Sequence, residues 1–283
     1  MKGKNNNQQK GNHHFIPQVY IQRFYDEEKK AVWRGKIQYK ETKYFSSAQI
    51  FYVHKLYDLK LLGKQFTDIE DSYANIENLV GDFYQKIDRY EKLDLSDEEN
   101  IELFYFIKTI LLIQYFRTED MKPEMFREQC TQLVNIYKSK DELFKTQFSF
   151  IKIEELRLFE KLIKKGIRKD KKYTNELIKG LQYTTLPLLL SNFNSKGITL
   201  IRNQKKYITS DKPVVCKNID DLLNLRNFIY PLSPNILVYA LGEDVTKDMI
   251  NDENKVNEFI ANNAISYIIS NDKDMVEKYM KAL

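Results

Sequence analysis

Residues 12–24 read Asn-His-His-Phe-Ile-Pro-Gln-Val-Tyr-Ile-Gln-Arg-Phe, and they hold two of the chain's three histidines side by side. Pro17 suits the first turn of a helix, because the N–H that proline lacks would have no helical partner there. The predicted helix runs from Pro17 to about Tyr25, since one face carries residues at helical spacing: Val19, Tyr20, Arg23 and Phe24. His13 and His14 precede this helix in an extended segment, where neighbouring side chains point to opposite sides. At most one histidine is therefore expected to face a common site.

The composition is that of an ordinary globular protein. The chain has 283 residues, of which 42% are hydrophobic and 30% charged. This length is enough for one large domain or two small ones, with a sizeable core. The net charge of +5 permits binding to phosphates without demanding it. The aromatic share of 13% accompanies abundant Lys, Asn and Ile, which is typical of an AT-rich genome, so it is not taken as a sign of base stacking.

Residues 1–11 form a polar leader, for which we predict a disordered tail. The chain contains no apolar run of the roughly 20 residues that span a bilayer, and the leader has no apolar signal region. Cys130 and Cys216 form no metal or redox spacing, which favours inert thiols in a reduced compartment. We therefore predict a cytoplasmic protein that does not contact a membrane.

The middle of the chain, about residues 67–193, has a helical pattern. Capping-box pairs three residues apart open two helices, Thr67 with Glu70 and Ser96 with Glu99. The first helix is expected to end near Ile87 and the second, strongly apolar, near Phe116. Further helices are predicted at 124–138 after Pro123, at 142–165 and at 175–192, with Pro187 kinking or starting part of the last one. The basic run 164–172 is interpreted as a solvated turn, with a phosphate-binding patch as the minority alternative.

Strand patterns lie on both sides of this helical middle. The first are 31–38 and a short piece near Phe51–Val53. After Gly197 the predicted strands are 198–202, 207–209, 236–241 and 267–270, with helices at 245–260 and 272–283. These patterns predict an α+β protein: a predominantly helical body with a small, mostly antiparallel sheet formed by N- and C-terminal strands. Residues 12–283 are expected to form a single domain, strand-rich over about 197–270.

Four segments carry polar residues that a core does not require. They are His13-His14 with Gln18, the carboxylates Glu70 and Glu77 on the first long helix, Gln114 to Thr118 at the end of the apolar helix, and Thr209-Ser210-Asp211 at a strand end. Each also has a structural interpretation. His14 would bond a backbone carbonyl, Glu77 would be solvated, Gln114 and Arg117 would cap their helix, and Ser210 and Asp211 would form a turn.

The stretch His-His-Phe-Ile-Pro-Gln-Val-Tyr-Ile-Gln-Arg-Phe resembles the opening signature of domain-of-unknown-function family 4238, found in bacteria. Further matching segments follow in the order that the family has: Glu70 with Ile76-Glu77, Gln114 with Arg117-Thr118, Ile208 to Val215, Pro231 to Pro234, and Asn257 to Ser270. The departures are Val19, Ile21 and Lys212, where the family usually has Phe, Leu, and Asn or His. Some members are associated with defence against phage. The resemblance therefore implies a nucleic-acid-directed toxin or effector rather than a metabolic enzyme.

The first hypothesis is a metal-dependent phosphodiesterase, that is, a nuclease. His14, Glu77 and Asp211 would bind Mg²⁺ or Mn²⁺, since an imidazole and two carboxylates are adequate ligands. The ion would polarise a phosphoryl oxygen and activate a water, with His13 as general acid or base. Arg23 and Arg117 would hold the phosphate of a nucleic acid. Gln18 and Gln114 would orient other groups, as would Ser210.

The second hypothesis is a non-catalytic binding or sensing protein. The same polar residues would then form a buried hydrogen-bonded network that fixes the fold, or a pocket for an anion. A nucleotide cofactor is not expected, because the 9 glycines of the chain form no phosphate-binding loop. The sequence does not decide between these two hypotheses.

Overall fold

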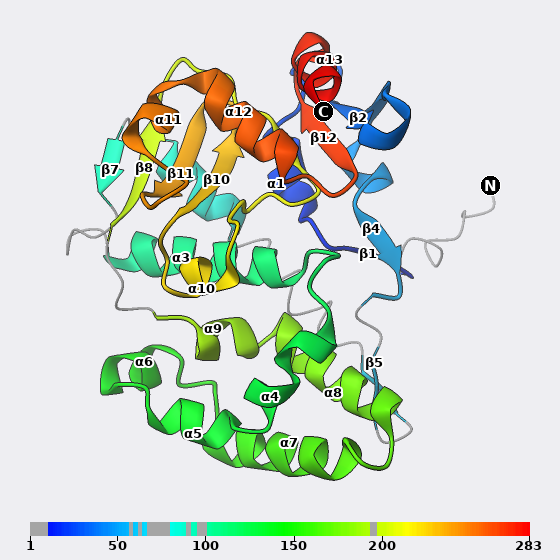
Figure 1. The fold of residues 1–283 in the computed structure, drawn as a ribbon, viewed down its shortest axis with the longest axis vertical. Coiled ribbons are helices and arrows are strands. Elements are labelled where there is room, and N and C mark those ends of the chain that lie inside the picture. Colours follow the sequence, from blue (N-terminus) through cyan, green and yellow to red (C-terminus); the bar gives the residue numbers. More distant parts are fainter. Residues whose placement is uncertain are drawn as a thin grey trace, which may run out of the picture.

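The fold has two sheet-bearing regions beside a long helix, with a layer of shorter helices on the other side of that helix (Figure 1). It is seen in a computed structural model that describes residues 11–56, 59–61, 64–66, 80–88, 92–94, 101–192 and 197–283. The long helix, α3 (Ile101–Phe116), crosses the middle of the molecule. The predicted α+β class is confirmed, with a helical body and antiparallel sheets.

The opening stretch forms the predicted extended segment and helix, but the helix ends at Gln22 rather than near Tyr25. Strand β1 (Asn12–His14) pairs antiparallel with β4 (Tyr52–His54), and helix α1 (Gln18–Gln22) begins directly after Pro17. The two-stranded sheet β1–β4 thus brings His14 opposite Tyr52. A further short hairpin joins β5 (Leu59–Leu61) to β6 (Lys64–Phe66).

One four-stranded sheet joins the two ends of the chain, as predicted. Its order is β3–β2–β12–β9, and every pairing is antiparallel. The strands are β2 (Val32–Lys36), β3 (Glu41–Phe45), β9 (Thr209–Ser210) and β12 (Tyr267–Ser270). Gly35 allows helix α13 (Lys273–Ala282) to pack on this sheet, because a Cβ there would lie only 2.5 Å from Cγ1 of Val276.

The second four-stranded sheet has the order β10–β11–β8–β7, and all its pairings are antiparallel. Its strands are β7 (Lys92–Asp94), β8 (Ile198–Arg202), β10 (Phe228–Ser233) and β11 (Ile236–Ala240). The sequence predicted β8 and β11 but missed β10, where every residue is buried. Pro231 explains the omission, because a proline within a run argues against a strand. Here it lies beside a register shift in the β10–β11 pairing.

The predicted helices of the middle region are confirmed only in part. Residues 80–87 are helical, whereas 67–79, with Thr67 and Glu70, lie outside the described residues. The single helix predicted over 124–138 is wrong, since the chain forms η5 (Pro123–Phe126), α4 (Arg127–Cys130) and α5 (Leu133–Lys138). The hydroxyl of Thr131 donates to the carbonyl of Glu128 at the second break. Such local bonds compete with the helix.

The other helical segments divide in a similar way. The region 142–192 contains α6 (Glu142–Gln147), α7 (Ile153–Gly166), α8 (Lys171–Tyr183) and α9 (Leu186–Leu190). The basic run lies at the turn between α7 and α8, and Pro187 lies in the first turn of α9, where a proline is tolerated. The C-terminal part adds α10 (Ile219–Leu223), α11 (Lys247–Asn251) and α12 (Glu253–Asn262). The single helix predicted over 245–260 is divided at Asp252, which lies between α11 and α12 and caps α12 with its side chain.

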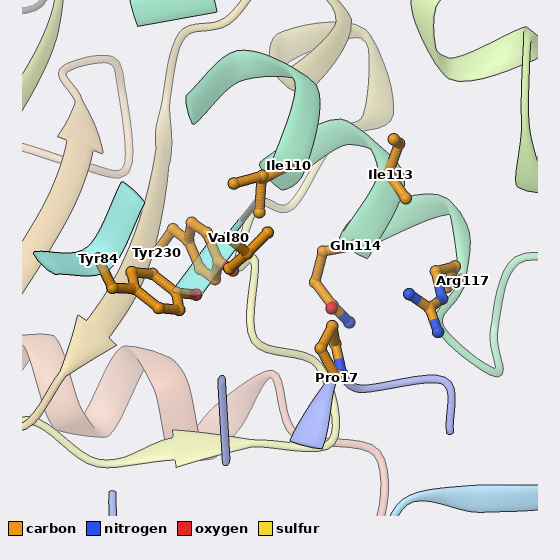
Figure 2. A pocket seen from close by; sticks show the side chains of 8 residues that line it. All are labelled: Pro17, Val80, Tyr84, Ile110, Ile113, Gln114, Arg117 and Tyr230. Carbon is orange, nitrogen blue, oxygen red and sulfur yellow. The ribbon is translucent and has the colours of Figure 1, made fainter. Parts of the chain in front are cut away.

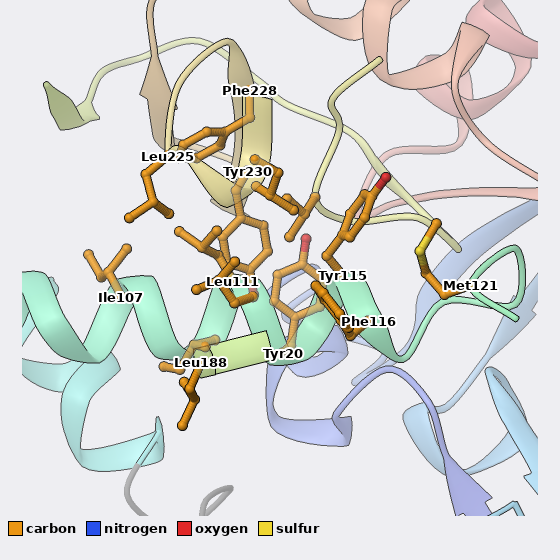
Figure 3. Close-up of a cluster of buried hydrophobic side chains, with 14 of the residues drawn as sticks. Tyr20, Ile107, Leu111, Tyr115, Phe116, Met121, Leu188, Leu225, Phe228 and Tyr230 are labelled. Carbon is orange, nitrogen blue, oxygen red and sulfur yellow. The ribbon is translucent and has the colours of Figure 1, made fainter. Parts of the chain in front are cut away.

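The core forms two clusters. The larger one packs α1, α3 and the inner face of the second sheet together (Figure 3). Tyr20 stacks on Tyr230 with ring centroids 5.6 Å apart, and both are almost completely buried. The smaller cluster lies among the two sheets and α11 to α13. In the described part of the chain, no helix is long and apolar enough to cross a membrane.

Candidate functional site

The last turn of α3 holds the backbone of the opening stretch. The Nε2 of Gln114 donates to the carbonyl oxygen of Phe15 at 3.1 Å, and the guanidinium of Arg117 donates to the carbonyl oxygen of His14. Gln114 is 2% exposed and Arg117 4% exposed. We had expected these side chains to cap their own helix. Instead they bind the carbonyl groups of residues about a hundred positions earlier in the chain. Both act as positioning residues for the segment around His14.

Helix α1 is held from the other side by β9 of the first four-stranded sheet and β10 of the second. The hydroxyl of Tyr20 lies 2.7 Å from Oγ1 of Thr209 and donates to the carbonyl of Pro231 at 2.7 Å. The Nε of Arg23 donates to the carbonyl of Leu232 at 2.8 Å, and its Nη2 forms an ion pair with Asp88 at 2.7 Å. Arg23, predicted to hold a phosphate, thus has a structural attachment and an acidic neighbour. The negative charge of Asp88 offsets much of the positive charge with which Arg23 could attract an anion.

The two histidines face different surroundings. His13 is 3% exposed, whereas His14 is half-buried, in line with their expected alternation along β1. The Nδ1 of His14 lies 3.5 Å from Nε2 of Gln18, whose Oε1 accepts from the hydroxyl of Ser47 at 3.2 Å. Burial is the main cause that lowers the pKa of His14, and the charges of Arg117 and His13 lower it further, against hydrogen bonds with the backbone at Ser47 and Ala48. The surroundings of His14 therefore favour the neutral form of the imidazole.

Ser210 and Asp211 organise the edge of the first sheet. The Asp211 carboxylate accepts hydrogen bonds from three consecutive N–H groups, those of Ile265, Ser266 and Tyr267, at 2.9, 2.7 and 3.1 Å. The hydroxyl of Ser210 donates to the carbonyl of Lys212 at 3.1 Å and accepts from its N–H. Burial raises the pKa of Asp211 to about 6 even though the three N–H bonds act in the opposite direction. Holding the backbone before β12 is thus a demonstrated role of this carboxylate.

No group of three or more His, Cys, Asp or Glu side chains lies close enough to hold a metal ion, within the residues that the structure describes. Glu77, one of the three predicted ligands, lies outside those residues. The set of His14, Glu77 and Asp211 therefore stays a prediction. The carboxylate oxygens of Asp211 already accept hydrogen bonds from three N–H groups, so a metal ion would have to compete with these groups for the oxygens.

A small cavity lies at the meeting point of Pro17, the helical segment 80–87, α3 and β10 (Figure 2). Its volume is about 20 Å³. Apolar groups make most of the wall, and Gln114 and Arg117 are the polar residues of α3 that border it; the lining residues are Pro17, Val80, Tyr84, Ile110, Ile113, Gln114, Arg117 and Tyr230. Of the predicted site residues, Gln114 and Arg117 border this cavity, whereas His14 and Asp211 are not among its lining residues.

Cations and aromatic rings gather on one face of the sheet β3–β2–β12, beside the buried residues Val32 and Ile269 of the same face. The guanidinium of Arg34 lies 3.8 Å from the ring centre of Phe45 and 4.6 Å from that of Tyr267. The ammonium of Lys36 lies 4.4 Å from the ring centre of Tyr39, which is 62% exposed. Lys43 pairs with Arg34 across β2–β3 and so shares this face. We call these six residues, Arg34, Lys36, Tyr39, Lys43, Phe45 and Tyr267, the cation–aromatic surface.

Ring contacts connect Tyr267 of this surface to His14 by way of Phe51, a core residue that is 5% exposed. The ring of Phe51 contacts that of Tyr267 at 6.0 Å, and the next residue, Tyr52, contacts the His14 ring at 5.7 Å. Sequence reasoning missed the surface, because the aromatic residues were discounted as a compositional effect. The alternation of Arg34 and Lys36 along β2 was the available signal, but the partners on β3 and β12 follow only from strand register.

The fold and site define an α+β protein whose N-terminal segment is held between the end of α3 and the strands β9 and β10. A family model described as "Protein of unknown function (DUF4238)" matches residues 12–274. The chain belongs to this family, which confirms the resemblance of its opening stretch. Searches of curated proteins and of solved structures gave no match.

Proposed function

We propose that this protein is a nucleic-acid-directed effector that holds a single strand on its cation–aromatic surface. The observation that carries the proposal is the group of cations and rings on the sheet β3–β2–β12. Three cations, Arg34, Lys36 and Lys43, lie on this face with one carboxylate, Glu41, which pairs with Lys43 at 2.5 Å. The excess positive charge complements phosphates.

A single strand fits this surface better than a duplex. Tyr39 and Tyr52 are 62% and 40% exposed, so each ring offers a face on which a base could stack. Bases within a duplex are stacked on one another and are not available to side-chain rings in this way. Arg34 is held between Phe45 and Tyr267, which keeps its charge near the sheet rather than in solvent. The surface thus combines the two features that single-strand binding requires, rings and cations.

Tyr39→Ala is expected to weaken binding of a fluorescent 20-nucleotide single strand by roughly tenfold, since stacking one base is worth about 1–3 kcal/mol. The double variant Lys36→Ala/Lys43→Ala should bind less tightly and reduce the slope of log K against log salt by about 0.7 for each phosphate that the protein no longer neutralises. Fluorescence anisotropy with DNA and RNA strands, and with the matching duplexes, measures both.

Phe150→Ala is the matched control, because Phe150 has the same exposure, 62%, and lies between α6 and α7. It should leave binding unchanged. The proposal fails if the protein binds no strand at low salt, or if Phe150→Ala weakens binding as much as Tyr39→Ala.

A second candidate function is a metal-dependent phosphodiesterase in defence against phage. It is favoured by the ring contacts that connect His14, through Tyr52 and Phe51, to Tyr267 of the cation–aromatic surface. The lowered pKa of His14 also favours the neutral imidazole, the form that binds metals or accepts a proton. His14 would act on the strand, with His13, Glu77 and Asp211 as the remaining predicted groups and Mg²⁺ or Mn²⁺ as the ion. Gln18 would orient the His14 ring and Arg117 its backbone.

For this candidate, the purified protein with Mn²⁺ or Mg²⁺ should cleave single strands, and EDTA should abolish cleavage. His14→Ala should reduce the rate by at least about a hundredfold, the range of lost general acid–base catalysis, while strand binding in anisotropy remains. Cleavage by His14→Ala at the wild-type rate would reject the catalytic role. Binding without cleavage under any metal would leave the non-catalytic sensing function as the better account.

A further inference from the structure

The cavity beside α3 contains a buried acceptor with an unmet requirement. Gln114 is 2% exposed, and its Nε2 donates to the carbonyl of Phe15, which fixes the orientation of the amide. Its Oε1 is completely buried, and no donor among the described residues reaches it. Figure 2 shows the amide above Pro17, between Val80 and the Arg117 guanidinium. A buried acceptor without a donor is unfavourable and rare, so a missing partner is expected.

The size of the cavity limits what this partner can be. The volume of about 20 Å³ accommodates one water molecule, which needs roughly 10–15 Å³. No larger ligand fits without movement of the wall. A cation of similar size is disfavoured by the neighbouring Arg117, and an apolar atom would leave Oε1 without a donor. Among bound ligands, this leaves a small neutral molecule that donates a hydrogen bond.

We propose that the cavity is a binding site for one resident water molecule, which donates a hydrogen bond to Oε1 of Gln114. A buried water normally has two to four polar partners. The Arg117 guanidinium can donate to the water, and the hydroxyls of Tyr84 and Tyr230 belong to side chains that border the same space. The surrounding Val80, Ile110 and Ile113 exclude further solvent.

The water has a positioning role. Gln114 and Arg117 are the two side chains through which α3 holds the backbone at Phe15 and His14. A water beside Oε1 completes the hydrogen bonding of the Gln114 amide and keeps it in the orientation that meets Phe15. The occupant therefore helps to set the position of the opening stretch relative to α3. This inference does not depend on nucleic-acid binding.

A crystal structure at about 1.8 Å or better tests the site directly. We expect one spherical peak 2.7–3.2 Å from Oε1 of Gln114, the hydrogen-bond range. Crystals under xenon pressure should show no xenon there, because xenon enters dry apolar cavities. An empty cavity, or one that takes up xenon, would overturn the proposal.

Two variants test the role of the water in solution. Val80→Ile adds one methyl group to the wall, so it should displace the water and lower the Tm. In a dry cavity the same methyl group would improve packing and raise the Tm.

Gln114→Met removes the acceptor and should remove the electron-density peak of the water. Gln182→Met is the control, since Gln182 also donates from a fully buried amide, to Phe116 and Met121, but does not border this cavity. In the Gln182→Met variant, the electron-density peak of the water beside Gln114 should remain. A higher Tm for Val80→Ile would reject the water even if Gln114→Met failed to fold.

Discussion

Asp211→Ala is expected to lower the free energy of unfolding by about 4 kcal/mol, because each buried donor left without a partner costs roughly 1–3 kcal/mol. The carboxylate accepts from Ile265, Ser266 and Tyr267, and the residue is only 3% exposed, so water cannot replace it easily. For a chain of this size the Tm should fall by roughly 10 °C. Urea denaturation followed by circular dichroism measures the change.

Asp252→Ala is the matched control for this prediction. Asp252 also accepts from backbone N–H groups, those of Asn254 and Lys255, but at the exposed start of α12. Its loss should cost only about 1 kcal/mol, the usual value of a helix cap. Equal losses in the two variants would contradict the structural role of Asp211. Its motif would then be better explained by the predicted metal site.

The pH dependence of stability gives a second measure of Asp211. Its pKa of about 6 in the folded protein lies above the ordinary value of 3.8. Between these values the folded state binds more protons than the unfolded state, so this group makes stability fall as pH rises from about 4 to above 6. A difference of about 2 between the folded and unfolded pKa corresponds to roughly 3 kcal/mol. Carboxyls with lowered pKa values, such as Asp88 and Asp120, act in the opposite direction. Subtracting the pH profile of Asp211→Asn from that of the wild type isolates the Asp211 contribution.

Tyr20→Phe is expected to lower the free energy of unfolding by about 2 kcal/mol. The change removes only a hydroxyl, yet it breaks two short bonds, to Thr209 and to the carbonyl of Pro231. All of these groups are buried, so the Thr209 hydroxyl and the Pro231 carbonyl lose a partner that solvent cannot supply. Figure 3 shows Tyr20 beside Tyr230 and Phe116 in the middle of the main core. The hydroxyl of Tyr20 thus joins α1 to two strands, β9 and β10, through hydrogen bonds.

Chemical denaturation of Tyr20→Phe should be compared with that of Tyr207→Phe. Tyr207 is equally buried, but its hydroxyl accepts one bond, from the side chain of Asn203 at 2.9 Å. That variant should lose about 1 kcal/mol or less. If both variants lost the same free energy of unfolding, the two hydrogen bonds of the Tyr20 hydroxyl would not contribute more to stability than the single bond of Tyr207.

The local elements were largely predictable because they depend on patterns within short stretches. Strands β8 and β12 and the end of α3 at Phe116 fall where the sequence placed them. The errors also have local physical causes. Pro231 concealed the buried strand β10, and side-chain bonds at Thr131 and Asp252 divided helices that looked continuous.

The candidate site was predictable in its members but not in their roles. The sequence marked Gln114 and Arg117 because a core helix does not need them, and it marked Asp211 at a strand end. Their partners are backbone groups of distant segments: the carbonyls of Phe15 and His14, and the N–H groups of 265–267. Glu77 and the metal set stay predictions, since Glu77 lies outside the described residues.

By itself, then, the sequence determined the α+β class, the family and the importance of residues 12–24. These follow from periodicity, capping residues and motif order, which are properties of neighbouring positions. Only the tertiary structure decided that α3 holds the His14 backbone, that Asp211 serves the start of β12, and that Arg34 lies between Phe45 and Tyr267. The reason is that hydrogen bonds and ring contacts form between groups brought together by strand register and helix packing, and such contacts leave no periodic signal along the chain.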